Sequence, residues 1–168
     1  MLRYFVAPCL LLWSLGAAQA APVDGQCAQR FLSTLADPAK AREASRFFDM
    51  AGAPASSSAK TQRALATLTQ KLAGITRVEP LASMPDGKTA RVEIGSSIGD
   101  APFIGSAFSA VSGADGKVFF FVSQRAGYSC SINSLALHIP SSQPHFEERA
   151  RDIARAISAN QAVSRGSD

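Results

Sequence analysis

The run Val118-Phe119-Phe120-Phe121-Val122 constrains the fold more than any other part of the chain. It is apolar and rich in β-branched and aromatic residues, and therefore predicts the central strand of a sheet. Side chains alternate along a strand, so Phe119 and Phe121 point to one face and Phe120 to the other. A strand that is apolar on both faces is typical of a sheet covered on both sides. We therefore expect helices to pack on both faces.

The first residues have the pattern of a secretory signal. Arg3 precedes an apolar run from Val6 to Leu15, and a small-x-small triplet ends at Ala20. The apolar run is about half of the roughly 20 residues that span a bilayer, so we expect no membrane span. The sequence predicts a signal peptide over residues 1–20, cleavage after Ala20, and a periplasmic or secreted protein.

Two of the three cysteines remain after the leader is removed. Cys9 lies inside the leader, which leaves Cys27 and Cys130 in an oxidising compartment. We expect them to form a disulfide that closes a loop of about 100 residues and stabilises the fold by on the order of 4 to 5 kcal/mol in the chain-entropy model. The alternative is two separate buried cysteines.

Helical periodicity dominates the first half of the mature chain and the segment that follows Pro140. Capping residues and glycines divide the first half into three short helices, and Ser142 is a candidate N-cap for an amphipathic helix near the C-terminus. The expected helices cover residues 24–36, 37–51, 58–73 and 142–157.

From Ile75 onward the apolar pattern alternates, which is typical of strands. A turn at 85–88 predicts a hairpin between the first two strands, and a turn at 113–116 predicts a second hairpin that ends in the phenylalanine strand. An irregularity is expected at Asn133-Ser134. The expected strands cover residues 75–84, 89–95, 103–112, 118–122 and 128–139, with Pro80 placing the first at an edge.

These elements predict a single α+β domain over residues 21–160, followed by a flexible polar tail over 161–168. In this fold, N-terminal helices pack on a curved antiparallel sheet of about five strands, with a C-terminal amphipathic helix.

Composition argues against nucleic-acid binding. The 17 basic and 13 acidic residues are interspersed, and no basic patch stands out. Trp13 and Tyr4 lie in the leader, so Tyr128 is the only hydrogen-bonding aromatic residue of the mature chain. Stacking on bases or sugars would depend on phenylalanines, which we interpret as core residues.

The segment Gly95-Ser96-Ser97-Ile98-Gly99 matches the G-x-S-x-G pattern of serine hydrolases. That nucleophile elbow joins a strand to a helix, whereas Ser97 lies between two expected strands. We therefore interpret the segment as a glycine-serine loop.

The remaining candidates for chemistry are few. Cys27, Cys130, His138 and His145 could ligate zinc by residue type, but no two of them stand at a ligand spacing, so we expect no metal and no cofactor. A general base at His138 or His145, beside one of three acids, is the catalytic alternative to a surface histidine. The three acids are Glu147, Glu148 and Asp152.

Several short segments together resemble a known layout. Helices carrying F-L-S-T-L and F-F-D-M, a helix closing in L-A-G-I, and the hairpins D-G-K-T-A-R-V-E-I and D-G-K-V-F-F-F-V resemble the cystatin-like roll of the nuclear transport factor 2-like superfamily, over about residues 26–125. The resemblance implies a curved antiparallel sheet wrapped around a helix, with an apolar mouth that serves binding domains, inhibitors or small enzymes. The end of the chain, L-A-L-H-I-P before an amphipathic helix, is similar to the Mog1/PsbP-like sandwich.

Export, an apolar sheet and the lack of convergent polar chemistry favour a non-enzymatic binding module. We expect a protein partner or a small apolar ligand to bind on the concave face of the sheet, with Phe103, Phe108 and Tyr128 as contact residues. One alternative is an inhibitor or immunity protein directed against an exported enzyme. The other is a small hydrolase or isomerase that uses His138 or His145.

Overall fold

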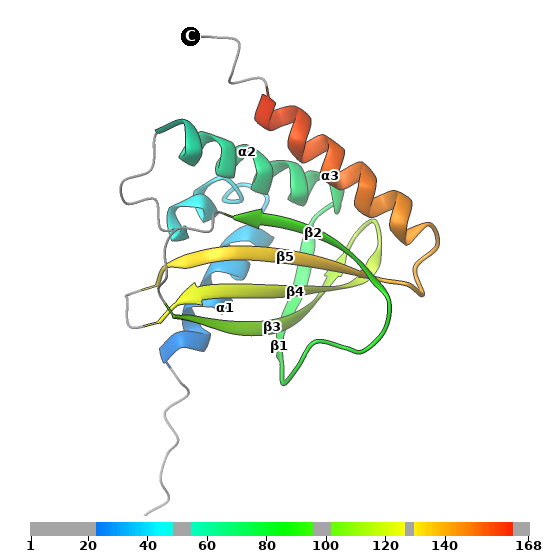
Figure 1. The fold of residues 1–168 in the computed structure, drawn as a ribbon, viewed down its shortest axis with the longest axis horizontal. Coiled ribbons are helices and arrows are strands. Elements are labelled where there is room, and N and C mark those ends of the chain that lie inside the picture. The colour runs from blue at the N-terminus through cyan, green and yellow to red at the C-terminus, as the bar shows by residue number, and fades with distance from the viewer. Residues whose placement is uncertain (1–22, 49–54, 96–101, 127–129, 163–168) are drawn as a thin grey trace, which may run out of the picture.

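A computed structural model describes residues 23–48, 55–95, 102–126 and 130–162 (Figure 1). The predicted signal peptide, Ser97, Tyr128 and residues 163–168 lie outside these ranges. The elements are α1 (Val23–Ala36), the 3-10 helix η1 (Glu43–Phe47), α2 (Ala55–Lys71), β1 (Ile75–Leu81), β2 (Thr89–Gly95), β3 (Phe103–Ser112), β4 (Gly116–Arg125), β5 (Ile132–Pro140) and α3 (Phe146–Ala162).

The strands form one antiparallel five-stranded sheet in the order β1-β3-β4-β5-β2. The α+β layout is confirmed, and so is the central position of β4. β3 and β4 form the expected hairpin, whose turn ends at Gly116 with a φ of 70°, a value that favours glycine. The β4–β5 register shifts between Ser123 and Gln124, opposite Asn133, which confirms the predicted irregularity.

The predicted hairpin between the first two strands is wrong, because β1 and β2 lie at opposite edges of the sheet. β1 pairs with β3, whereas β2 pairs with β5, where Val92 stands opposite Leu137 and Ile94 opposite Leu135. The chain between them sweeps past the end of the sheet (Figure 1). The turn residues at 85–88 signalled a change of direction correctly, but a turn does not determine which strand the chain pairs with next.

The predicted helix over residues 37–51 is also wrong in its described part, because η1 is the only helix over residues 37–48. Phe47 and Phe48 are both buried, and each packs edge-on against Phe31, with ring centroids 5.9 and 5.6 Å apart. Neighbouring residues of a helix point about 100° apart. The backbone instead becomes extended at Phe48, which forms a bridge with Ile132, and both rings thereby reach the core.

The core lies between the helices and one face of the sheet, which we call the covered face. In Figure 1, α1 passes behind β3, β4 and β5, while α2 and α3 lie toward the β2 edge. The predicted disulfide between Cys27 and Cys130 is present and ties α1 to the chain that enters β5. The β4 and β5 side chains on the covered face are at most 1% exposed: Val118, Phe120, Val122, Gln124, Leu135, Leu137 and Ile139.

Candidate functional site

The other face of the sheet, which we call the open face, has no helix over it among the described residues (Figure 1). The expectation that helices cover both faces of β4 is therefore wrong. Phe119 is half-buried on this face, and Phe121 is 36% exposed. The cross-strand neighbours of Phe121 are the small residues Ala107 and Ala136, and Phe119 stands between Ser109 and His138. Large rings next to small side chains can lie along the sheet, so β4 is accommodated without a second helical layer.

The open face has an aromatic centre with charges around it, and one of them is on β4 itself: the Lys117 ammonium lies 5.6 Å from the centroid of the Phe119 ring. The register aligns Glu79, Ser109, Phe119, His138 and Arg91 in one row across the five strands. Only the outermost two members of this row are formally charged. An aromatic centre with a charged rim is the arrangement that protein-binding surfaces commonly show.

His138 is held within the open face by its neighbours. Its Nδ1 lies 3.1 Å from the hydroxyl of Thr89. Burial and then the adjacent Arg91 guanidinium hold the pKa of His138 below its ordinary value of 6.5, while the more distant effect of Glu93 opposes them. The ring is therefore neutral at pH 7, and its hydrogen bond to Thr89 gives it a packing role in the sheet.

The catalytic alternative paired a histidine with an acid near the start of α3. The structure brings His145 and Glu148 to 3.7 Å, with both side chains at least 75% exposed. Asp152 is engaged elsewhere, by Lys71 at 3.2 Å. An exposed pair in water has neither the desolvation nor the fixed geometry that tune a general base.

Three large apolar side chains stand out as exposed in the described part of the chain: Phe103 at 38%, and Ile104 and Phe121 at 36% each. We call them the apolar patch. Phe103 and Phe121 share the open face with Gly105, over which the Phe121 ring lies so closely that a Cβ atom would overlap its Cζ, whereas Ile104, opposite Gln124, points to the other side of the strand end. The glycine is thus required for the ring to lie flat across β3.

The three residues that the sequence predicted for binding lie in different environments. Phe103 belongs to the apolar patch, as a surface contact residue would. Phe108 is 2% exposed and faces the helices, so it is a core residue that a docking partner does not touch. Tyr128 lies outside the described residues. Ile104 and Phe121 were not selected, although the end position of Ile104 in its strand is a signal of exposure.

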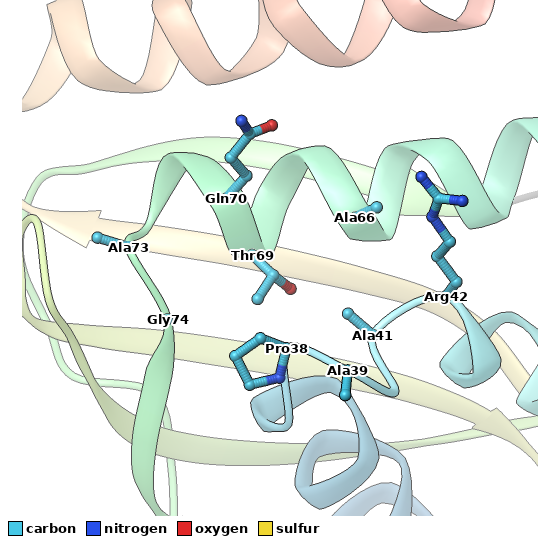
Figure 2. A pocket seen from close by; sticks show the side chains of 9 residues that line it. All are labelled: Pro38, Ala39, Ala41, Arg42, Ala66, Thr69, Gln70, Ala73 and Gly74. Carbon is cyan, nitrogen blue, oxygen red and sulfur yellow. The ribbon is translucent and has the colours of Figure 1, made fainter.

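A separate hollow of about 590 Å³ lies between α2 and the segment from Pro38 to Arg42 (Figure 2). Its walls are mainly alanine methyl groups and the ring of Pro38. Gln70 and Arg42 point away from its floor in Figure 2, and the hydroxyl of Thr69 donates to the carbonyl of Leu65 in its own helix. The hollow therefore presents few polar groups that could orient a ligand.

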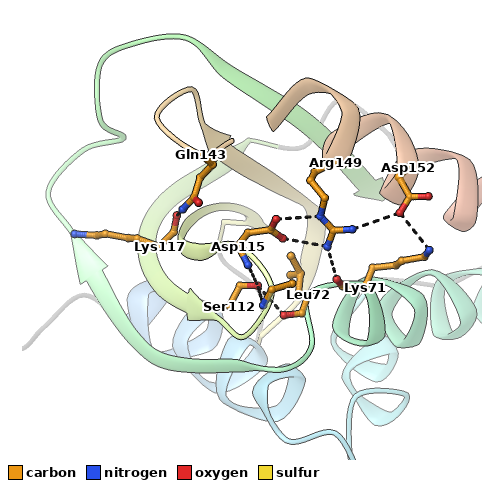
Figure 3. Close-up of polar contacts among 9 residues, drawn as sticks. Lys71, Leu72, Ser112, Asp115, Lys117, Gln143, Arg149 and Asp152 are labelled. Carbon is orange, nitrogen blue, oxygen red and sulfur yellow. Dashed lines mark hydrogen bonds and ion pairs between the residues drawn. The ribbon is translucent and has the colours of Figure 1, made fainter. Parts of the chain in front are cut away.

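A polar cluster joins α3 to the turn between β3 and β4 (Figure 3). Arg149 donates through Nε to Asp115 Oδ1 at 3.0 Å and through Nη2 to the carbonyl of Lys71 at 2.6 Å. The Asp115 side chain is 6% exposed and that of Arg149 is 29% exposed. The hydrogen bond with Asp115 raises the pKa of Arg149 above its ordinary value.

The same turn is fixed to the end of α2. The Ser112 hydroxyl donates to the carbonyl of Leu72 at 2.6 Å and accepts the N–H groups of Ala114 and Asp115, each at 3.1 Å. Asp115 belongs to the predicted turn at 113–116, and Arg149 of α3 is directed toward it instead of into solvent. Every polar group of the cluster is used within the fold, so its role is to hold α3 in place.

No family model, curated protein or solved structure matches this chain. Within the described ranges, none of the helices is long and apolar enough to cross a membrane. The described residues likewise contain no group of three or more His, Cys, Asp or Glu side chains placed to hold a metal ion.

Proposed function

We propose that the protein is an exported, non-enzymatic binding module that engages a protein partner through the apolar patch and the adjoining open face. The observation that carries the proposal is the exposure of Phe103 and Phe121 beside one glycine on the open face, with Ile104 exposed at the same strand end. Large apolar side chains gathered at one place on a surface are typical of interaction sites. Elsewhere the helix-covered face buries its aromatic residues in the core.

The shape of the patch favours a protein over a small apolar ligand. Its side chains lie on a strand end and a flat sheet face, whereas small ligands bind in concave sites that enclose most of their surface. The nearby charges of Arg91 and Glu93, paired at 3.0 Å, supply a polar rim for such an interface.

Export is part of the proposal. The disulfide is compatible with an oxidising compartment, and the signal pattern over residues 1–20 supplies the route. The layout resemblance to the cystatin-like superfamily stays a prediction, and a binding or inhibitory role is what it implies.

The test compares a double variant, Phe103→Ser with Phe121→Ser, with a control double variant on α3, Glu147→Ala with Arg151→Ala. The control removes an exposed pair with side chains about 70% exposed. The purified mature proteins are cross-linked in a periplasmic extract, the partner is identified by mass spectrometry, and its affinity is measured by calorimetry.

We expect all proteins to melt at similar temperatures. The patch variant should lose at least about tenfold in affinity, since two anchors are removed, and the control should bind as the parent does. Equal binding by the patch variant and the parent would exclude this surface as the binding site.

A further inference from the structure

The apolar patch coincides with a free strand edge. β1 pairs with β3 only from Ala107, opposite Leu81, to Ser112, opposite Ile75. β3 begins at Phe103, so residues 103–106 have a strand neighbour on the β4 side and none of the described strands on the other. A strand edge of this kind presents backbone donors and acceptors that can pair with another chain.

The hydrogen-bond alternation determines which groups face this edge. The N–H of Ala126 donates to the carbonyl of Pro102 at 3.0 Å, so Pro102 directs its backbone toward β4. In an antiparallel ladder successive residues point their backbone groups to opposite neighbours. Phe103 and Gly105 therefore direct their N–H and C=O groups to the free edge, while Ile104 bonds toward β4.

β1 and β2, the two outer strands of the sheet, carry features that hinder pairing with a strand of another chain, and the edge at residues 103–106 differs from them. β1 carries Pro80, and its register with β3 shifts between Thr76 and Glu79, where Arg77 has a φ of 51°. β2 is packed against α3 (Figure 1). Proline, irregular register, charges and helical cover are the devices by which proteins prevent unwanted strand pairing. Within the described ranges, none of these devices protects residues 103–106.

The chemistry of the edge specifies the partner segment. Residues 102–112 and 118–124 contain no charged side chain. A second copy of this chain is a poor occupant, because four residues span only about 13 Å and a stable dimer needs about 1,200 Å² or more of buried surface. A foreign segment can add the strand here and continue over the open face.

We propose that residues 103–106 accept an uncharged, extended segment of a partner protein as an additional strand, with apolar side chains of that segment against Phe103 and Phe121. The inference rests on the proposed function, whose patch supplies the side-chain contacts. Backbone pairing supplies affinity, and the alternation of side chains supplies specificity, as in other strand-addition interfaces.

The test separates the backbone donor from the ring. Phe103→Ala removes the ring alone, whereas Phe103→Pro removes the ring and the outward N–H, a position where proline leaves the β4 ladder intact. The probe is a synthetic heptapeptide of alternating valine and threonine. Its control is an analogue with prolines at two adjacent central positions, which removes donors from both edges of the peptide.

With the parent protein, we expect the heptapeptide to shift the backbone amide NMR signals of Phe103 and Gly105 and to slow their hydrogen exchange, and we expect the proline analogue to do neither. Phe103→Pro should bind the peptide about tenfold more weakly than Phe103→Ala, since it lacks a backbone hydrogen bond and pairs poorly.

Equal affinity of the two variants, equal binding of the two peptides, or no binding of either peptide by the parent would overturn strand addition. The peptide comparison uses the unaltered protein, so it holds whatever the stability of Phe103→Pro. The double patch variant could fail to bind the natural partner while the two Phe103 variants bind it with equal affinity. That result would support the proposed binding function and exclude strand addition as its mechanism. If the patch variant keeps the partner, the proposed function itself falls.

Discussion

The two faces of β4 carry the same kind of side chain but have different surroundings. Phe120 is fully buried under the helices, whereas Phe121, its neighbour in the chain, is 36% exposed on the open face. The phenylalanines alone do not distinguish the two faces, because alternation assigns each ring to a face without saying what covers it. The difference shows that a strand with apolar side chains on both faces can be buried on one face and partly exposed to solvent on the other.

The disulfide should contribute the largest single effect, and it acts on the covered side of the sheet. Cys27 and Cys130 are 103 residues apart in sequence. Replacing both by alanine should lower the free energy of unfolding by about 4 to 5 kcal/mol, because the unfolded chain gains the entropy of an open loop. Denaturant unfolding of the variant and the parent checks this. Equal midpoints with equal slopes would mean that the bond does not constrain the unfolded state.

The comparison of the two faces itself is tested by single alanine variants of adjacent phenylalanines. Phe120→Ala should cost about 3 to 5 kcal/mol, since it leaves a cavity in a close-packed core. Phe121→Ala should cost about 1 to 2 kcal/mol, because the residue is 36% exposed and less apolar surface is lost from a packed environment. Thermal and denaturant unfolding measure both. Similar losses would show that the open face is a second core, which would remove the basis for a binding surface there.

α3 is attached by a charge pair in addition to buried apolar side chains such as Ile153. Arg149→Met should destabilise the fold by about 3 kcal/mol, because it leaves the buried carboxylate of Asp115 without its partner. Arg151→Met, a change at an exposed site on the same helix, is the matched control and should cost almost nothing. Equal stability of the two variants would assign α3 docking to its apolar side chains alone.

Replacing His138 should have the smallest effect on stability. It changes how the free energy of unfolding depends on pH, and thereby tests the environment of the open face. The pKa of His138 is lower in the folded state than the ordinary 6.5, so the folded protein binds fewer protons than the unfolded chain. Its stabilising contribution is present above pH 6.5 and is lost as the pH falls through the folded pKa. His138→Gln should flatten this part of the stability curve measured by denaturant unfolding between pH 5 and 7.5. An unchanged slope would mean that the ring is as well hydrated as in the unfolded chain.

Local patterns in the sequence determined much of the fold. The run from Val118 to Val122 identified the central strand, since its composition favours a pleated, buried conformation. The turn at 113–116 identified the β3–β4 hairpin, because its glycines and aspartate act over a few residues. Two cysteines and a leader identified the disulfide, because the compartment leaves few alternatives.

Only the tertiary structure decided which elements become neighbours. β1 and β2 separate to opposite edges, and Arg149 reaches Asp115 across 34 residues of sequence, through contacts that no local pattern encodes. The apolar patch arises in the same way, because β1 is shorter than β3 and leaves Phe103 and Ile104 beyond its end. Backbone geometry determines that side chains alternate between the two faces of a strand. Whether a face is covered depends on how segments distant in the sequence pack against it. The sequence therefore determined which faces Phe119, Phe120 and Phe121 occupy, and only the assembled layers decided which face remains open.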